Sequence, residues 1–220
     1  MTTPTSCEGG LARAETDCPG PPRRGGAWAG RNAGACPLPE RETERVRLRQ
    51  FSPDDLGALA PILADPEVMT HLGLRGEAMT RPETETALMG IISHWRRKGF
   101  GRWAAEDKRT GRLMGFAGLR SFGRWAELVY LLDRPWWGRG IATEMARECL
   151  RFAFSEKGFA NVVAFTRPAN LASRRVLEKV GMRYEGTGEL FRLLEEAGDG
   201  YAKPEGADDI VVSIYSSHVC

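Results

Sequence analysis

The sequence has little of what marks a membrane-spanning, exported or disulfide-linked protein. No apolar run among its 220 residues approaches the roughly 18 residues that span a bilayer. The N-terminal stretch has no continuous apolar segment of the signal-peptide type. The five cysteines are odd in number, irregularly spaced and without a C-x-x-C pair, which argues against a disulfide framework and a zinc site. These absences predict a cytoplasmic protein that has no membrane contact and holds no metal.

A strong net charge is also missing. The chain has 31 lysines and arginines against 29 aspartates and glutamates, a formal net charge of +2. So small an excess gives no electrostatic reason to expect nucleic acid as a partner. The three histidines have poor spacing for metal ligation. His71, in a turn between the first two predicted helices, could line a ligand pocket or could simply be exposed.

The first 40 residues differ in composition from the rest of the chain. Proline and glycine interleave there, and large aliphatic residues are nearly absent. Such a segment buries too little apolar surface to offset the entropy of ordering it, so we expect residues 1–40 to be a disordered tail. The tail could bind a partner, or the start of the chain could be wrongly assigned. The folded domain is expected to occupy residues 41–220.

Apolar periodicity divides that domain into alternating elements. Strands are expected at 45–50, 101–107, 113–119, 126–132, 162–165, 183–194 and 210–215, and helices at 56–63, 80–99, 141–154 and 170–180, with a polar loop at 195–209. Thr80 and Glu83 have the spacing of a capping box at the start of the second helix. The order of elements predicts an α+β fold, a mostly antiparallel twisted sheet with helices on both faces.

The segment from Asp133 to Glu144 connects an apolar strand pattern to a helical pattern. It contains Gly138 and Gly140, and glycine lets the backbone adopt a positive φ and approach a ligand closely. The helix that follows leaves its first N–H groups unpaired and carries a partial positive charge at its start. The segment is a candidate site for a phosphate or pyrophosphate, although a plain strand-to-helix turn has the same pattern.

Two common nucleotide-binding patterns do not fit this turn. A P-loop needs lysine followed by serine or threonine after its last glycine, where this chain has Ile141 and Ala142. The dinucleotide fingerprint needs three spaced glycines, and this turn has only Gly138 and Gly140. The anion is therefore expected to belong to another kind of ligand.

The segment Trp137-Gly-Arg-Gly-Ile-Ala142 resembles the acetyl-CoA pyrophosphate loop of the GNAT superfamily of N-acetyltransferases. It is most similar to the branch that acetylates ribosomal-protein N-termini, the RimJ/RimL-like enzymes. Other segments resemble that family in the same order along the chain: a strand at 45–49, a hairpin at 111–119 and a helix at 170–182 with the pattern N-x-x-S-x-x-x-x-E-K-x-G. The resemblance covers about residues 41–213 and implies the GNAT acyltransferase fold and acetyl-CoA as cosubstrate.

The resemblance also implies which residues contact acetyl-CoA. They are Val129, Tyr130 and Leu131 on a strand, Trp137, Gly138, Arg139, Gly140, Ile141, Ala142 and Thr143 in the loop, and Asn170 and Ser173 on the next helix. Asn170 could also cap that helix. By the same resemblance, Glu127 is the candidate base, acting through water, and Ser173 could bond the cofactor sulfur or relay a proton. The plainer alternatives are a salt-bridged strand glutamate and a serine that bonds its own backbone.

The chain departs from the family pattern near the expected thioester. Leu177 stands where many members have a tyrosine that acts as general acid, and Val129 replaces a small residue. No activated cysteine or serine nucleophile is apparent, so the resemblance implies direct acetyl transfer to a primary amine. That amine is a protein N-terminus or a small amine, and the enzyme is expected to be a monomer or a homodimer.

Two other functions stay open on the sequence. An aminoglycoside or polyamine is a different class of acceptor, and the acidic run from Glu195 to Asp209 could attract such a cation or simply solvate a loop. A non-catalytic acyl-CoA-binding regulatory module is the second, since Leu177 replaces the usual tyrosine.

Overall fold

The computed structural model describes residues 40–72, 76–123, 125–197 and 210–218. The tail predicted over residues 1–40 lies outside these ranges except for Glu40, and so do residues 198–209 of the predicted acidic loop. Among the helices of the described ranges, none is long and apolar enough to cross a membrane.

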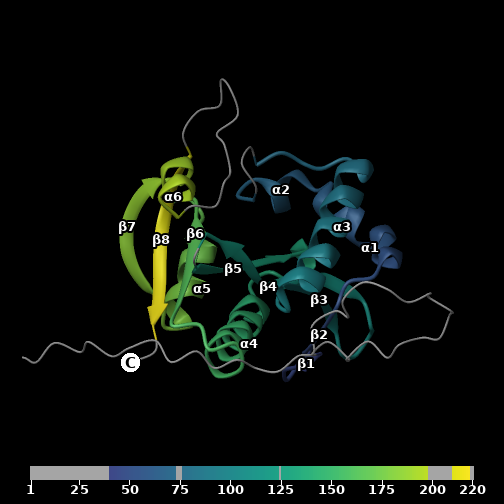
Figure 1. Cartoon of the computed structure of the whole chain (residues 1–220). Helices are drawn as coiled ribbons and strands as arrows, with labels where there is room; N and C mark the ends of the chain where they lie inside the picture. The colour runs from purple at the N-terminus through teal and green to yellow at the C-terminus, as the bar shows by residue number, and fades with distance from the viewer. Residues whose placement is uncertain (1–39, 73–75, 124, 198–209, 219–220) are drawn as a thin grey trace, which may run out of the picture. The chain divides into compact units, whose positions relative to one another are not determined.

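In these ranges eight strands form one sheet in the order β1-β2-β3-β4-β5-β6-β8-β7 (Figure 1). Neighbouring strands are antiparallel, except that β5 and β6 run parallel. The strands are β1 (Arg41–Glu42), β2 (Val46–Arg49), β3 (Arg102–Asp107), β4 (Leu113–Phe122), β5 (Trp125–Leu132), β6 (Asn161–Thr166), β7 (Arg183–Glu189) and β8 (Val211–His218).

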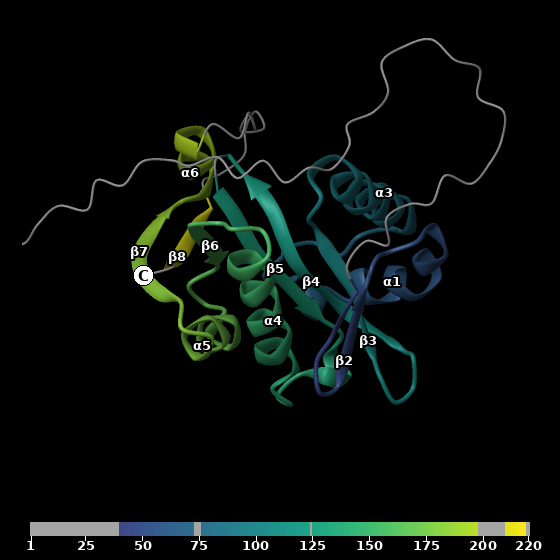
Figure 2. The same ribbon diagram turned by 60° about the horizontal axis from the view of Figure 1, so that its bottom comes forward.

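Helices cover both faces of this sheet, which confirms the predicted α+β class. Figures 1 and 2 show α1 and α3 together on one face and α4 and α5 on the other. The described helices are η1 (Pro53–Asp55), α1 (Leu56–Leu63), α2 (Pro66–Met69), α3 (Arg81–Lys98), η2 (Arg134–Trp136), α4 (Ile141–Ser155), α5 (Leu171–Lys179) and α6 (Leu190–Ala197).

Local sequence sets where α3 begins and ends. The capping box is present, with the Thr80 side chain accepting from the Glu83 N–H and the Glu83 carboxylate accepting from the Thr80 N–H. At the other end Gly99 adopts a left-handed conformation with φ 67°, which satisfies the last turn at little steric cost. The predicted capping box is therefore confirmed, and the helix ends at residue 98, one position short of the predicted range.

The prediction of one strand over residues 183–194 is wrong in its second half. Strand β7 ends at Glu189, and Leu190 begins the helix α6. Leu190, Phe191 and Leu194 are buried on one side of this helix, and Arg192 pairs with Glu196 one turn later. Helical spacing of the apolar residues therefore outweighed the extended pattern, and the predicted loop begins later than Glu195.

Aromatic rings fill the core between β3 and α4. The Trp103 ring centroid lies 5.0 Å from that of Trp95 and 4.8 Å from that of Phe152, both in edge-on arrangements. All three side chains are almost fully buried. Rings of this size contribute much of the apolar area that holds strand β3 against α3 and α4.

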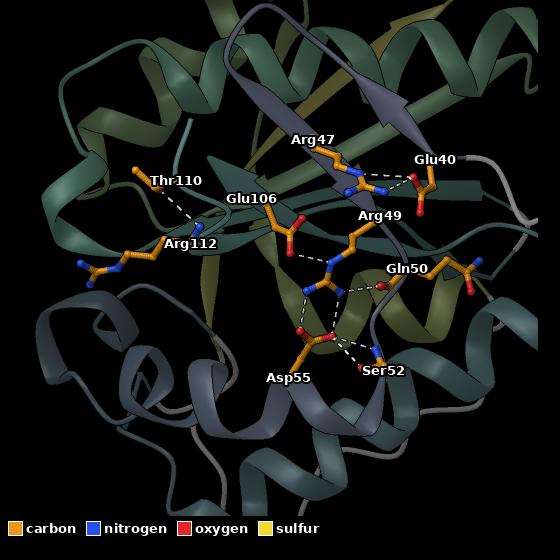
Figure 3. A network of polar contacts seen from close by, with 9 residues as sticks. All are labelled: Glu40, Arg47, Arg49, Gln50, Ser52, Asp55, Glu106, Thr110 and Arg112. Carbon is orange, nitrogen blue, oxygen red and sulfur yellow. Dashed lines mark hydrogen bonds and ion pairs between the residues drawn. The ribbon is translucent and has the colours of Figure 1, made fainter. Parts of the chain in front are cut away.

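A network of ion pairs ties β2 and β3 to the start of α1 (Figure 3). Arg49 on β2 donates to both carboxylate oxygens of Asp55, at 2.6 and 2.8 Å, and to Glu106 on β3 at 2.7 Å. The three side chains are only 10 to 22% exposed. Burial acts to raise the pKa of Asp55, but Arg49 and the Ser52 N–H outweigh it and hold that pKa below its usual value. The network stays ionised at neutral pH.

Candidate active site

A cleft opens where β5 and β6 stop pairing. Their register has two pairs, Ala126 with Val162 and Glu127 with Val163. The following residues of both strands, Leu128 to Leu132 and Ala164 to Thr166, line one cavity of about 750 Å³. Backbone groups on this side of β5 consequently have no strand partner on β6 and are available to a ligand. The volume lies within the usual range of small-molecule sites.

The glycine turn forms one end of this cleft. Gly138 and Gly140 adopt left-handed conformations with φ 72° and 77°. A Cβ at Gly138 would meet nothing within 4 Å, and one at Gly140 would meet only Arg45, at 3.7 Å. Helix α4 follows with no side-chain cap at its first turn. The first N–H groups of a 15-residue helix therefore stand beside open space, which fits a pyrophosphate.

The turn is anchored to β2 by a cluster around Glu144. The Glu144 carboxylate accepts from Thr43 Oγ1, from the Arg45 N–H at 2.8 Å and from Arg45 Nε at 2.7 Å. The same guanidinium donates to the Arg139 carbonyl at 2.9 Å, inside the turn. Sequence reasoning missed Arg45 because the two partners lie 99 residues apart. Arg45 both fixes the turn and adds a positive charge beside it.

The two tryptophans before the turn differ in their surroundings. Trp137 lines the cleft and donates from Nε1 to the Leu132 carbonyl at 2.7 Å, so it joins the turn to the end of β5. Trp136 also lines the cleft, but its Nε1 is buried without a hydrogen-bond partner. The Arg139 guanidinium lies over the Trp136 ring, 5.6 Å from its centroid. Of the predicted cofactor contacts, Arg139 is the one outside the cleft lining.

The start of α5 forms a second side of the cleft. Asn170 Oδ1 accepts from the Ser173 N–H at 3.0 Å, so the predicted capping role of Asn170 is confirmed. Ser173 Oγ lies 2.9 Å from the Tyr130 hydroxyl, which also donates to the Ser173 carbonyl at 3.1 Å. Burial raises the pKa of Tyr130, so this phenol stays protonated at neutral pH. The strand and helix thus bring two hydroxyl groups together.

Glu127 lies at the point where the strands separate. Its side chain is 4% exposed and forms an ion pair with Arg120, its cross-strand neighbour on β4. It is not among the residues that line the cleft. Leu177, at the position of the family tyrosine, is buried but does line the cleft. Cys149 is fully buried in α4, and burial raises its pKa, so it is no nucleophile.

Residues of α2 and the turn after it form the remaining wall. Glu67, Val68, Thr70, His71 and Leu72 line the same cavity as β5 and α5. Glu67 pairs with Arg134 of η2 at 2.9 Å. His71 is half-buried against the cleft, so the alternative of an exposed turn histidine is wrong.

A second hollow of about 890 Å³ lies beside the first, between α1, the start of β4 and η2. Its charged side chains pair with one another, as Arg134 does with Glu67 and Arg112 does with Asp133 at 3.4 Å. Because these charges already have partners, the cleft at β5 and β6 is the better site for a charged ligand.

Comparisons with known proteins agree with this geometry. Residues 45–183 match the family described as the GNAT acetyltransferase domain. The chain is 38% identical over 156 residues to YkkB of Bacillus subtilis (strain 168), covering 66% of this chain and 86% of YkkB. It is 30% identical over 172 residues to YoaA of the same organism, an uncharacterized N-acetyltransferase, covering 74% of this chain and 93% of YoaA.

Solved structures with similar folds include two acetyltransferases. One, a GNAT-family acetyltransferase from Bacillus anthracis, superposes with a TM-score of 0.66 at 22% identity over 81% of this chain and 98% of its own. The other is RimL, described as a ribosomal L7/L12 alpha-N-protein acetyltransferase in complex with coenzyme A. Its TM-score is 0.62 at 18% identity, over 80% of this chain and 96% of its own.

The fold, the strand gap and the open glycine turn are those of an acyltransferase that uses acetyl-CoA. The chain belongs to the GNAT acetyltransferase family, as the sequence resemblance predicted. It is therefore an enzyme of the GNAT N-acetyltransferase family, whose cosubstrate is acetyl-CoA.

Proposed function

We propose that this enzyme transfers the acetyl group directly from acetyl-CoA to a primary amine, at a protein N-terminus or on a small amine. The proposal is carried by the single cleft between β5 and β6, which has the glycine turn at one end and the wall of α2 beside it. Both substrates can meet there without a covalent enzyme intermediate. RimL, by its description, acts on a protein N-terminus, and its similar fold supports that class of acceptor.

Acetyl-CoA would be held by three groups of atoms. The N–H groups at the start of α4, from Ile141 to Thr143, with Gly138 and Gly140, would bind the pyrophosphate. The backbone of β5 from Val129 to Leu131, which has no partner on β6, would hydrogen-bond the amide-containing arm. Asn170 and Ser173 would flank the arm from α5.

The transfer itself needs two proton movements. The amine nitrogen attacks the thioester carbon, the new C–N bond forms, and the C–S bond breaks as CoA leaves as a thiolate. The amine loses a proton, which we assign to Glu127 through water, because this residue holds the last paired position of β5 before the strands separate. The thiolate gains a proton from the hydroxyl pair of Ser173 and Tyr130, which stands in place of the missing tyrosine at Leu177.

The function is tested by thiol release from acetyl-CoA over a panel of amines. The panel contains peptides that begin with alanine or serine, spermidine and an aminoglycoside. We expect saturable turnover with at least one of them. Tight acetyl-CoA binding without turnover of any amine would contradict the proposal.

The proton-transfer roles are tested by three variants. Glu127→Gln should lower kcat about 100-fold with little change in the Kd of acetyl-CoA, as expected for loss of a general base. Arg120→Met removes the same ion pair but keeps the carboxylate, so it separates a catalytic role from a structural one. Ser173→Ala should lower kcat about tenfold by breaking the hydroxyl pair. Equal losses in Glu127→Gln and Arg120→Met would remove Glu127 as the base.

A further inference from the structure

Two described histidines show opposite hydrogen bonding. His94 Nδ1 lies 2.9 Å from the Phe100 carbonyl, and its Nε2 lies 3.2 Å from Ser121 Oγ and 3.3 Å from the Ser121 N–H. In His71, by contrast, neither ring nitrogen has a hydrogen-bond partner within the described part of the chain, and Nδ1 is buried. Both ring nitrogens of His94 thus have hydrogen-bond partners, as in a structural residue. His71 borders the cleft, and its ring nitrogens can still form hydrogen bonds.

The burial of Nδ1 decides which nitrogen carries the proton. A neutral imidazole has one N–H donor and one acceptor nitrogen. A buried N–H without an acceptor is rarer in proteins than a buried acceptor without a donor. The favoured tautomer of His71 therefore leaves Nδ1 as a bare acceptor and places the hydrogen on Nε2, the nitrogen that is not buried. His71 then offers a hydrogen-bond donor to the cleft.

The position of His71 indicates which of the two substrates, acetyl-CoA or the acceptor amine, it contacts. The phosphate turn, the free edge of β5 and the start of α5 provide for acetyl-CoA, whereas His71 follows α2, which lies on the other side of β5 in Figure 1. The charged and titratable groups that share this cleft are Glu67 on α2, Tyr130 on β5, and Arg175 and Lys179 on α5. Arg175 and Lys179 lie on α5 with the cofactor contacts, and Glu67, the carboxylate of the described lining, is already paired with Arg134. This side of the cleft therefore offers no unpaired carboxylate to an acceptor that carries several ammonium groups.

We propose that His71 is a specificity residue that donates from Nε2 to a carbonyl oxygen of the acceptor, close to the amine that is acetylated. The acceptor class is then an α-amino amide, as at the N-terminus of a peptide, and not an alkyl polyamine. The inference rests on the proposed acetylation of a primary amine, and it narrows the class of amine that accepts the acetyl group. A site that hydrogen-bonds a substrate group discriminates strongly against analogues that lack the group.

The test compares two small amines that differ in the carbonyl group. Alaninamide and 2-aminobutane have similar size around the nitrogen, and they are compared at equal concentrations of neutral amine because their basicities differ. The wild-type enzyme should prefer alaninamide in kcat/KM. His71→Phe keeps a ring without the donor and should lower this preference about tenfold, the effect of one lost hydrogen bond. His71→Gln restores a donor at a similar reach and should keep the preference within about threefold of wild type.

Controls distinguish this inference from the function on which it rests. His94→Gln changes the other buried histidine and should leave the preference unchanged. A binding measurement adds a readout besides turnover: with CoA present, N-acetylalaninamide should bind wild type about tenfold more tightly than His71→Phe. Equal losses for both amines in His71→Phe, a Gln variant as poor as the Phe variant, or preferred turnover of spermidine would overturn the role of His71 while acetyl transfer stands. Absence of turnover with every amine would instead overturn the proposed function, and the role of His71 with it.

Discussion

The two walls of the cleft are built differently. The cofactor wall consists of the glycine turn and the starts of α4 and α5, and the acceptor wall consists of α2 and the turn that follows it. On the cofactor wall, Glu144 is fixed by Thr43 and Arg45, and Asn170 caps α5. On the acceptor wall, His71 has no hydrogen-bond partner in the described ranges, and the exposed Glu67 reaches only across to Arg134. Preorganised groups suit the substrate that every member of the family shares, whereas unpaired groups gain a partner only from the acceptor. From this contrast we expect affinity for acetyl-CoA to depend on one wall and selectivity for the amine on the other.

The largest expected loss of acetyl-CoA binding follows from changing the backbone conformation of the glycine turn in the cofactor wall. Gly140→Val places a β-branched side chain at φ 77°, a conformation that only glycine adopts readily. We expect the Kd of acetyl-CoA to rise more than 100-fold, about 3 kcal/mol, by isothermal titration calorimetry. Gly111→Val is a matched control, since Gly111 has φ 68° in a hairpin turn away from the cleft. Similar affinity in both variants would contradict the assignment of the phosphate turn.

Breaking the ion-pair network around Arg49, which lies outside the cleft lining, should lower stability and leave the difference between the two walls unchanged. Arg49→Met leaves Asp55 and Glu106 buried without their cation. We expect the free energy of unfolding to fall by about 3 kcal/mol in urea titrations, the usual cost of breaking a buried ion pair. The Kd of acetyl-CoA for the folded fraction should stay within twofold of wild type. A large change in that Kd would show that the network also shapes the cleft.

A smaller effect on acetyl-CoA binding is expected when the Arg45 side chain is removed. Arg45→Ala removes the bonds to Glu144 and to the Arg139 carbonyl, so the turn loses its tie to β2. We expect the affinity for acetyl-CoA to fall about tenfold with little change in the preference among amines. Arg47→Ala, two residues further along in β2, removes an exposed pair with Glu40 and serves as the control. If the two variants behave alike, Arg45 has no special role in the turn.

The smallest expected effect is the contribution of His94 to the pH dependence of stability. Burial lowers the pKa of His94 below its usual value of 6.5, although the Phe100 carbonyl acts to raise it. The unfolded chain then binds the proton more readily, so His94 contributes stability above pH 6.5 that is lost as the pH falls toward the folded pKa. Urea titrations should show that the free energy of unfolding falls between pH 7 and 5 and that this fall is smaller in His94→Gln. An unchanged pH dependence in His94→Gln would contradict this role of His94.

Local pattern was sufficient for much of the fold and for the cofactor end of the site. The capping box of α3, the glycine turn and the Asn170 cap each depend on residues a few positions apart, so they could be predicted from the sequence. The tie between Arg45 and Glu144 could not, since it depends on how β2 meets α4. Strand β7 was predicted too long because Leu190 to Leu194 fits both periodicities over so few residues. The tautomer and surroundings of His71 depend on packing alone.

The gap between β5 and β6 makes the empty and filled cleft distinguishable by hydrogen exchange. On one edge of β5, pairing with β4 continues from Trp125 to Leu132 and protects the amides there. On the other edge, pairing with β6 ends at Glu127. Amides that face the gap should exchange rapidly until the arm of acetyl-CoA bonds to them and should then become protected. Strand β5 thus acts as an intrinsic reporter of cofactor occupancy that requires no label and no knowledge of the acceptor.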